Sequence, residues 1–287
     1  MELGLHVAKF TWDGGVTEIA PTLAKVATTA EDAGFTRITV MDHLWQIGMV
    51  GAPEMEMLEA YTTLGYLAAV TKKVRLHTLV TGVIYREPGL LAKLVTTLDV
   101  LSGGRAGLGI GAAWFEEEAR GLGLPFPPTA ERFERLEETL QICLQMWSGN
   151  DAPYEGTHYQ LGRTLNSPAA ISTPHPYLMV GGAGERKTLR LVAKYADACN
   201  IFLGEETPRK LEALREHCER EGRNYDDIEK TTLVNGTLEG GAEPILAQLR
   251  HAHELGFTVA EIVIREDSPL PTLEMLGNDV IPEISRW

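Results

Sequence analysis

An aspartate and a histidine stand side by side where an apolar run ends, in the segment ITVMDHLW. An imidazole exchanges protons near neutral pH, so His43 can serve as a general acid or base. If the run is a strand of a parallel barrel, Asp42 and His43 lie at its carboxyl end, where such barrels carry their active sites. A plainer interpretation remains open, in which Asp42 caps local backbone and His43 packs beside Trp45.

Two other runs carry glycines in patterned positions. In RAGLGIGAAW, Gly107, Gly109 and Gly111 alternate, which places all three on one face of a strand. Glycine inside a strand indicates close approach of a ligand or of another backbone segment. A tightly packed barrel interior explains the pattern equally well. The GxG match is weak evidence for a nucleotide because the third glycine of that motif is absent.

The second glycine run, YLMVGGAGERKT, places Gly181, Gly182 and Gly184 directly before a predicted helix. Free backbone N–H groups at a helix start favour an anion such as phosphate. Arg186 and Lys187 add positive charge at the same place in an otherwise acidic chain. The pattern predicts a phosphate site, with a simple tight turn as the alternative.

A third segment, LVTGVIYREPG, contains Thr81, Gly82 and Val83. These residues can form a bulge or a strained peptide against which a flat ring leans, or the glycine can relieve crowding between strands. Other chemistries have less support in the sequence. The eight histidines form no HExxH motif or compact ligand cluster, so we predict no metal site. Without a GxSxG motif, serine hydrolysis is not predicted.

Short apolar runs that alternate with helical patterns must position these residues. Several of the runs lack polar alternation, which is typical of parallel strands covered by helices. The predicted strands are Leu3–Val7, Arg37–His43, Val74–Val83, Arg105–Gly111, Tyr177–Gly181, Ala198–Leu203, Thr232–Thr237 and Ala260–Arg265. The clearest helices are predicted over Ala130–Trp147, Glu185–Tyr195 and Pro244–Leu255.

Eight strands alternating with helices, without an obvious linker, predict one (β/α)₈ TIM barrel domain over residues 1–287. An open doubly wound sheet is the alternative, but its dinucleotide motif is missing after the first strand. The segment from Ser148 to Pro176 has no helical period and is rich in Pro, Gly, Ser and Thr. It precedes the fifth strand and is expected on the amino-terminal side of the barrel unless it folds over.

Composition narrows the class of protein further. The net charge of −14 argues against a nucleic-acid-binding surface. The three cysteines, Cys143, Cys199 and Cys218, are far apart and fit a reducing cytoplasm better than a disulfide scaffold. The amino terminus lacks the features of a signal peptide, and no run approaches the ~20 apolar residues of a membrane span. We therefore expect a cytoplasmic protein without membrane or nucleic-acid partners.

Taken together, these segments resemble the bacterial luciferase-like flavin and deazaflavin oxidoreductases. The resemblance rests on MDHLW, VTGV, LSGGRAGLGIGAAWFEEE and VGGAGERKTLRLVAKYADACN, which occur in the family's order over most of the chain. The last two segments are most similar to members that use coenzyme F420. The resemblance implies a (β/α)₈ barrel with an insertion before the fifth strand, a homodimer, and a small-molecule substrate.

The resemblance also implies roles for individual residues. Thr81, Gly82 and Val83 would carry a non-proline cis peptide behind the deazaflavin ring. Asp42 would contact the ring and His43 would exchange a proton with substrate or reduced cofactor. The remaining cofactor contacts would come from the ends of the fourth and fifth strands, with the phosphate at the fifth: Gly111, Ala112, Gly181, Gly182 and Gly184.

One position departs from the family pattern. Dehydrogenases of the family that act on glucose 6-phosphate have an acidic residue soon after the fourth-strand glycines, where this chain has Trp114. Trp114 is therefore expected in the substrate pocket, and a large aromatic there favours an apolar pocket over a sugar-phosphate site. Glu116, Glu117 and Glu118 follow; they can replace the missing acid, but we expect them to begin a solvated helix.

Three functions follow from these observations. The preferred one is an F420-dependent oxidoreductase that transfers hydride between the deazaflavin and a small organic substrate. The second is a monooxygenase that uses reduced flavin mononucleotide (FMN) and oxygen. The third is a deazaflavin- or flavin-binding protein without catalytic activity, because the DH and GG elements can serve binding alone.

Overall fold

The computed structural model describes residues 1–287, and its centre is a closed barrel of eight parallel strands in the order β1-β10-β9-β8-β7-β4-β3-β2. This arrangement confirms the predicted (β/α)₈ barrel. The strands are β1 Glu2–Val7, β2 Arg37–Asp42, β3 Arg75–Gly82, β4 Gly107–Gly111, β7 Tyr177–Gly181, β8 Ala198–Asn200, β9 Glu229–Gly236 and β10 Val259–Ile264.

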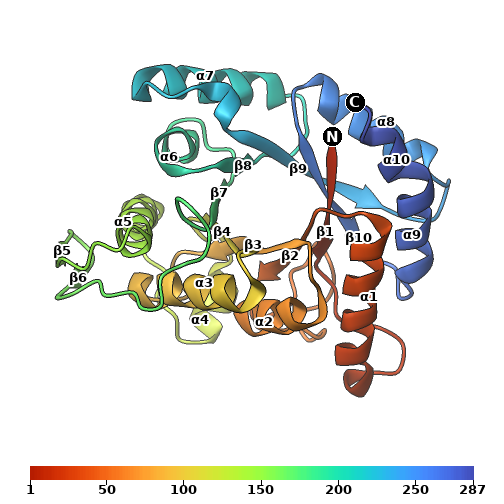
Figure 1. The fold of residues 1–287 in the computed structure, drawn as a ribbon, viewed down its shortest axis with the longest axis horizontal. Helices are drawn as coiled ribbons and strands as arrows, with labels where there is room; N and C mark the ends of the chain where they lie inside the picture. Colours follow the sequence, from red (N-terminus) through yellow and green to blue (C-terminus); the bar gives the residue numbers. More distant parts are fainter.

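Helices cover the outside of the barrel, as Figure 1 shows. They are α1 Ile19–Ala33, α2 Ala60–Val70, α3 Pro88–Ser102, α4 Glu116–Gly121, α5 Thr129–Trp147, α6 Thr188–Tyr195, α7 Thr207–Glu221, α8 Glu243–Glu254, α9 Leu270–Met275 and α10 Ile281–Ile284. None of them combines the length and apolarity that crossing a membrane requires. The two chain ends meet, because the amino-terminal nitrogen of Met1 donates to the carbonyl of Ile284 at 2.8 Å.

Each predicted strand has a counterpart in the barrel. All six residues of β2 are buried, as expected for a strand between a barrel interior and a helical layer. The predicted bounds of β7 match the structure, whereas β8 ends at Asn200 rather than at Leu203. The predicted helix at Glu185 begins three residues later, at Thr188.

The alternating glycines of β4 are explained mainly by packing inside the barrel. A Cβ atom on Gly109 would lie 2.0 Å from the carbonyl oxygen of Thr78, and one on Gly107 would lie 2.9 Å from the Tyr177 ring. Neither position can hold a larger residue without moving the backbone at Thr78 or the Tyr177 ring. Only Gly111, at the end of β4, lines a cavity.

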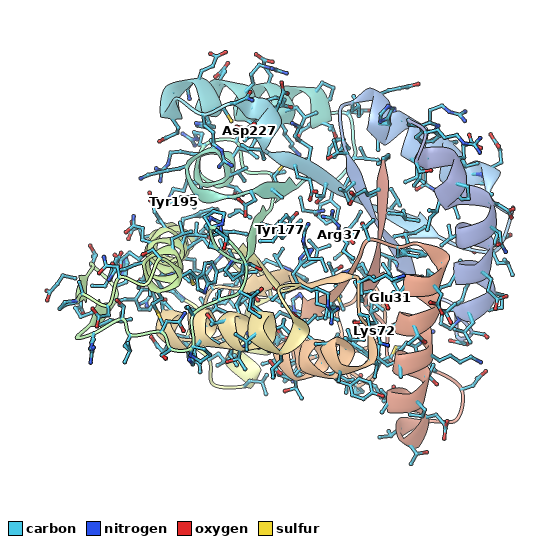
Figure 2. The ribbon with its side chains drawn as sticks, in the orientation of Figure 1. Glu31, Arg37, Lys72, Tyr177, Tyr195 and Asp227 are labelled. Carbon is cyan, nitrogen blue, oxygen red and sulfur yellow. The ribbon has the colours of Figure 1, made fainter.

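A buried ionic cluster lies inside the barrel at the amino-terminal ends of its strands. Arg37 pairs with both carboxylate oxygens of Glu229, at 2.6 and 3.1 Å, and with Glu2 at 2.8 Å. Figure 2 shows Arg37 and Tyr177 at the centre of the molecule, and their side chains are within hydrogen-bond distance. Glu261 lies 4.0 Å from Arg37 and is fully buried with neither carboxylate oxygen hydrogen-bonded. Burial raises the pKa of Glu261 to about 7, although Arg37 opposes the shift.

The irregular segment before the fifth barrel strand forms a small hairpin, β5 Tyr154–Glu155 with β6 Gln160–Leu161, and then an extended return. The hairpin lies beside α5, where Glu138 accepts hydrogen bonds from three of its backbone amides. The return follows α3, and Asp99 accepts from the amides of Ile171 and Ser172. The segment therefore covers α3 and α5, and none of its residues lines the cavity described below.

Candidate active site

A cavity of about 460 Å³ opens at the carboxyl ends of the barrel strands. Of its 28 lining residues, 16 are hydrophobic, which is typical of small-molecule sites. Strand ends that are far apart in sequence meet here, so the cavity collects nine of the predicted site residues: Asp42, His43, Thr81, Gly82, Gly111, Ala112, Trp114, Gly181 and Gly182.

Two predicted cofactor residues do not line this cavity. Val83 is buried in the hydrophobic core. Gly184 lies in the turn before α6, where its carbonyl accepts a hydrogen bond from the amide of Leu189 at 3.1 Å. Val83 and Gly184 therefore lie outside the cavity, whereas the nearby residues Gly82 and Gly182 line it.

His43 is held by a buried carboxylate. Its Nδ1 atom lies 3.1 Å from Oε2 of Glu118. The other oxygen of Glu118, Oε1, accepts hydrogen bonds from the backbone amides of Leu44 at 2.5 Å and Trp45 at 2.8 Å. The Tyr85 hydroxyl donates to Oε2 of the same carboxylate. One glutamate side chain therefore fixes both the His43 ring and the loop that follows it.

The prediction that Glu116–Glu118 form a solvated helix start is wrong for Glu118. Glu116 and Glu117 are exposed, but Glu118 points inward and its side chain is fully buried. Burial raises the pKa of this carboxyl, but the hydrogen bonds from His43, Tyr85 and two amides outweigh it, so the pKa lies below its ordinary value. Glu118 is therefore ionised and can accept the hydrogen of His43 Nδ1.

Asp42 is also buried, and Arg86 neutralises it. The two terminal guanidinium nitrogens of Arg86 lie 2.5 and 2.9 Å from the carboxylate oxygens of Asp42. Arg86 also donates a hydrogen bond to the Glu59 carboxylate at 2.6 Å. Burial raises the pKa of Asp42, and the ion pair offsets only part of that shift. Because its charge is matched within the protein, Asp42 presents a paired carboxylate to the cavity.

The non-proline cis peptide lies between Leu79 and Val80, so its expected place at Thr81–Val83 is wrong. Thr81 and Gly82 stay in the strand ladder and pair with Ile110 and Gly111 of β4. The cis peptide lies earlier in β3, at the point where the pairing of β3 with β2 shifts register between Val40 and Asp42. Leu79 and Val80 line the cavity beside the predicted residues.

The turn after β7 has a backbone conformation and a tight packing that favour glycine. Gly182 has a φ of +113°, a conformation that strongly favours glycine. A Cβ atom on Gly181 would come within 2.7 Å of a Val80 methyl carbon. Arg186 and Lys187 are exposed and take part in no ion pair; Lys187 Nζ lies 5.4 Å from the centre of the Phe133 ring, which lines the cavity.

Sequence reasoning missed several residues that complete the site. His6 lines the cavity and bonds Thr39 at 2.9 Å, and burial, with His43 nearby, lowers its pKa to about 3. Tyr85 and Asn200 are further missed lining residues. His6 is the penultimate residue of the predicted strand Leu3–Val7, a position that could have identified it. Asn200 is the last residue of β8, but the predicted strand extends to Leu203, so no such signal marks Asn200 in the sequence.

Comparison with known proteins places this architecture in a family. The luciferase-like monooxygenase family profile matches residues 1–257. A relative from Nakamurella multipartita, named F420-dependent glucose-6-phosphate dehydrogenase, is 31% identical over 290 residues, covering 97% of this chain and 82% of its own.

Solved structures share the fold at lower identity. The monooxygenase RslO1 from Streptomyces bottropensis superposes with a TM-score of 0.82 at 17% identity, covering 99% of both chains. The coenzyme F420-dependent tetrahydromethanopterin reductase from Methanopyrus kandleri gives 0.79 at 17% identity, again over 99% of both chains. The family match and the relative's identity and coverage agree with the barrel and its cavity: this chain belongs to the luciferase-like monooxygenase family.

Proposed function

We propose that this chain is an F420-dependent oxidoreductase that transfers a hydride between the deazaflavin ring and a small organic substrate. The observation that carries the proposal is the pairing of His43 with buried Glu118 beside the cavity. In the same cavity, the ends of β4 and β7 present the glycines Gly111 and Gly181, which leave room for a cofactor. The 31% identical relative named for F420 and glucose 6-phosphate supports the cofactor.

The cavity residues fit a flat cofactor with an anionic end. Leu79, Val80 and Gly111 form an apolar surface on one side of the cavity. Any side chain larger than that of glycine at Gly111 or Gly181 would crowd Val80. The volume of about 460 Å³ lies within the range of cofactor sites, roughly 300–1,000 Å³. Gly182, with unpaired Arg186 and Lys187 close by, suits a phosphate.

His43 supplies the proton transfer. Because Glu118 accepts from Nδ1, that nitrogen carries the hydrogen and Nε2 is left to exchange a proton with a substrate oxygen in the cavity. Bound F420 supplies the hydride acceptor in its oxidised form and the donor in its reduced form. Asp42, already paired with Arg86, would contact the cofactor without adding net charge.

A second function, an FMN-dependent monooxygenase, is favoured by the RslO1 likeness, which is a likeness of fold. Titrating the purified protein with F420 and with FMN, followed by absorbance and fluorescence, separates the two. We expect F420 to bind at micromolar concentration or below and FMN at least about tenfold more weakly, a difference of about 1.4 kcal/mol. Tight binding of FMN without binding of F420 would overturn the proposal.

We also propose that the protein is a cytoplasmic homodimer. The free, buried state of all three cysteines supports the cytoplasm, where thiols stay reduced. The family resemblance supports a homodimer. Light scattering on the purified chain measures the assembly, and a monomer at micromolar concentration would contradict a homodimer.

A further inference from the structure

Three large apolar side chains line the cavity and yet remain exposed to solvent. Met49 is 65% exposed, Trp114 56% and Phe202 60%. They follow three different strands, β2, β4 and β8, and it is the fold of the barrel that places all three at the same cavity. Exposed apolar surface that converges on a cavity marks a site for an apolar ligand. We call these three residues the apolar rim.

The apolar rim lies beside the proposed proton-exchanging group. The ring centres of Trp114 and His43 are 5.3 Å apart in an edge-to-face arrangement, and Phe115 stacks on Trp114 at 5.1 Å. A molecule that contacts Trp114 can therefore place an oxygen atom near His43. The Trp114 ring thus packs against two aromatic neighbours, His43 and Phe115.

Charged groups that would recognise a sugar phosphate are scarce in the same cavity. Arg265 is the only lysine or arginine among the lining residues. Arg86 lies nearby, but Asp42 and Glu59 occupy its guanidinium. Phosphate sites are typically built from several charge-assisted donors, and Arg186 and Lys187 near Gly182 belong to the proposed cofactor site.

We propose that the substrate is an uncharged, mainly apolar molecule with one hydroxyl or carbonyl oxygen, whose apolar part contacts Met49, Trp114 and Phe202. The inference rests on the proposed function, because it assigns the substrate side of the same cavity. It departs from the glucose 6-phosphate named for the relative. Its signature is an affinity that increases with the apolar length of the ligand.

The test uses F420-loaded protein, a series of 2-alkanones from 2-butanone to 2-octanone, and glucose 6-phosphate. Isothermal calorimetry measures the dissociation constant of each. We expect the constant to fall by about fourfold for each added methylene that becomes buried. Glucose 6-phosphate should bind at least about a hundredfold more weakly than 2-octanone.

Variants Trp114→Ala and Phe202→Ala should flatten this dependence on chain length, and Leu101→Ala is the matched control. Leu101 is 71% exposed on α3 and does not line the cavity, so its variant should keep the wild-type slope. A slope unchanged in both rim variants would overturn the inference. A Trp114→Ala protein that loses its assembly state in light scattering would also overturn it, because a second copy would then cover the rim.

The fluorescence of bound F420 separates this inference from the proposed function. If F420 binds and glucose 6-phosphate binds more tightly than every alkanone, the substrate class is wrong while the proposed function stands. If F420 does not bind, the proposed function fails first. Alkanone binding that tracks chain length in the cofactor-free protein would still support the apolar rim.

Discussion

The Nδ1 atom of His43 lies 3.1 Å from Oε2 of Glu118, although the two residues are 75 positions apart in the chain. Glu118 also accepts two backbone amides of the loop after β2, so it orients the histidine and the strand end together. Outer groups of this kind set the tautomer and direction of a working imidazole. In the proposed mechanism Glu118 is therefore a positioning residue, and His43 is the group that exchanges the proton.

Replacing Glu118 with Gln keeps the shape of the side chain and removes its charge. We expect kcat to fall by about 10- to 100-fold, while KM and the F420 dissociation constant stay within about threefold. The split between kcat and KM is the measurement, because a merely structural role would change cofactor binding as well. Glu117→Gln, an exposed neighbour on α4, is the control and should behave as wild type. Equal losses in kcat and in F420 affinity would contradict the positioning role.

His43→Ala removes the proposed proton-exchanging group. With a substrate in hand, we expect kcat to fall by about 10²- to 10⁴-fold, the usual contribution of a positioned acid or base. The F420 titration should remain close to wild type, which distinguishes an enzyme from a protein that only binds the cofactor. His251→Ala, an exposed position on α8, serves as the control. Unchanged turnover would remove His43 from the mechanism.

Gly181→Ala tests the bare backbone at the end of β7. The new methyl would lie 2.7 Å from a methyl carbon of Val80, which lines the cavity, so the Val80 side chain must move. We expect a stability loss of about 1–3 kcal/mol and an F420 affinity at least about tenfold weaker. Chemical denaturation and the F420 titration measure the two effects.

Gly65→Ala is the matched control for Gly181→Ala. Gly65 lies inside α2, where an added Cβ meets nothing within 4 Å, so this variant should gain about 0.5–1 kcal/mol. F420 affinity equal to wild type in Gly181→Ala would show that this backbone does not contact the cofactor.

Glu261 makes stability depend on pH at the opposite end of the barrel. Its pKa is about 7 in the folded chain, against 4.5 in its ordinary range, so between these pH values the folded state binds more protons than the unfolded state. The free energy of unfolding therefore falls as pH rises from 4.5 to 7 and then levels off. Ionising this buried group costs about 1.4 kcal/mol per pKa unit, roughly 3 kcal/mol in total.

Glu261→Gln should remove that pH dependence. Relative to wild type, the variant should gain roughly 2 kcal/mol on going from pH 5 to pH 8 in urea unfolding. Arg37 keeps its pairs with Glu229 and Glu2 in the variant. Glu254→Gln, exposed on α8, controls for the loss of one surface charge. Parallel pH profiles for wild type and Glu261→Gln would contradict the raised pKa.

Local patterns in the sequence were sufficient for the barrel and for much of the cavity. Unbroken apolar runs predict buried parallel strands, and residues at their carboxyl ends, such as His43 and Gly181, meet because every strand of a parallel barrel ends on the same face. The glycines were correctly singled out, but their reasons differ: Gly109 serves the packing of the barrel interior and Gly182 the turn after β7.

Only the tertiary structure decided which of three consecutive glutamates faces His43. Glu116, Glu117 and Glu118 are identical in type, and the direction of α4 buries the third alone. The cis peptide between Leu79 and Val80 lies where the pairing of β2 with β3 shifts register, a relation between strands that no local pattern contains. The sequence alone determined which segments form the strands and which reactive residues, such as His43, lie near their ends, because burial and backbone preference are local. Pairings such as His43 with Glu118 depend on how distant elements pack, and only the folded chain determines them.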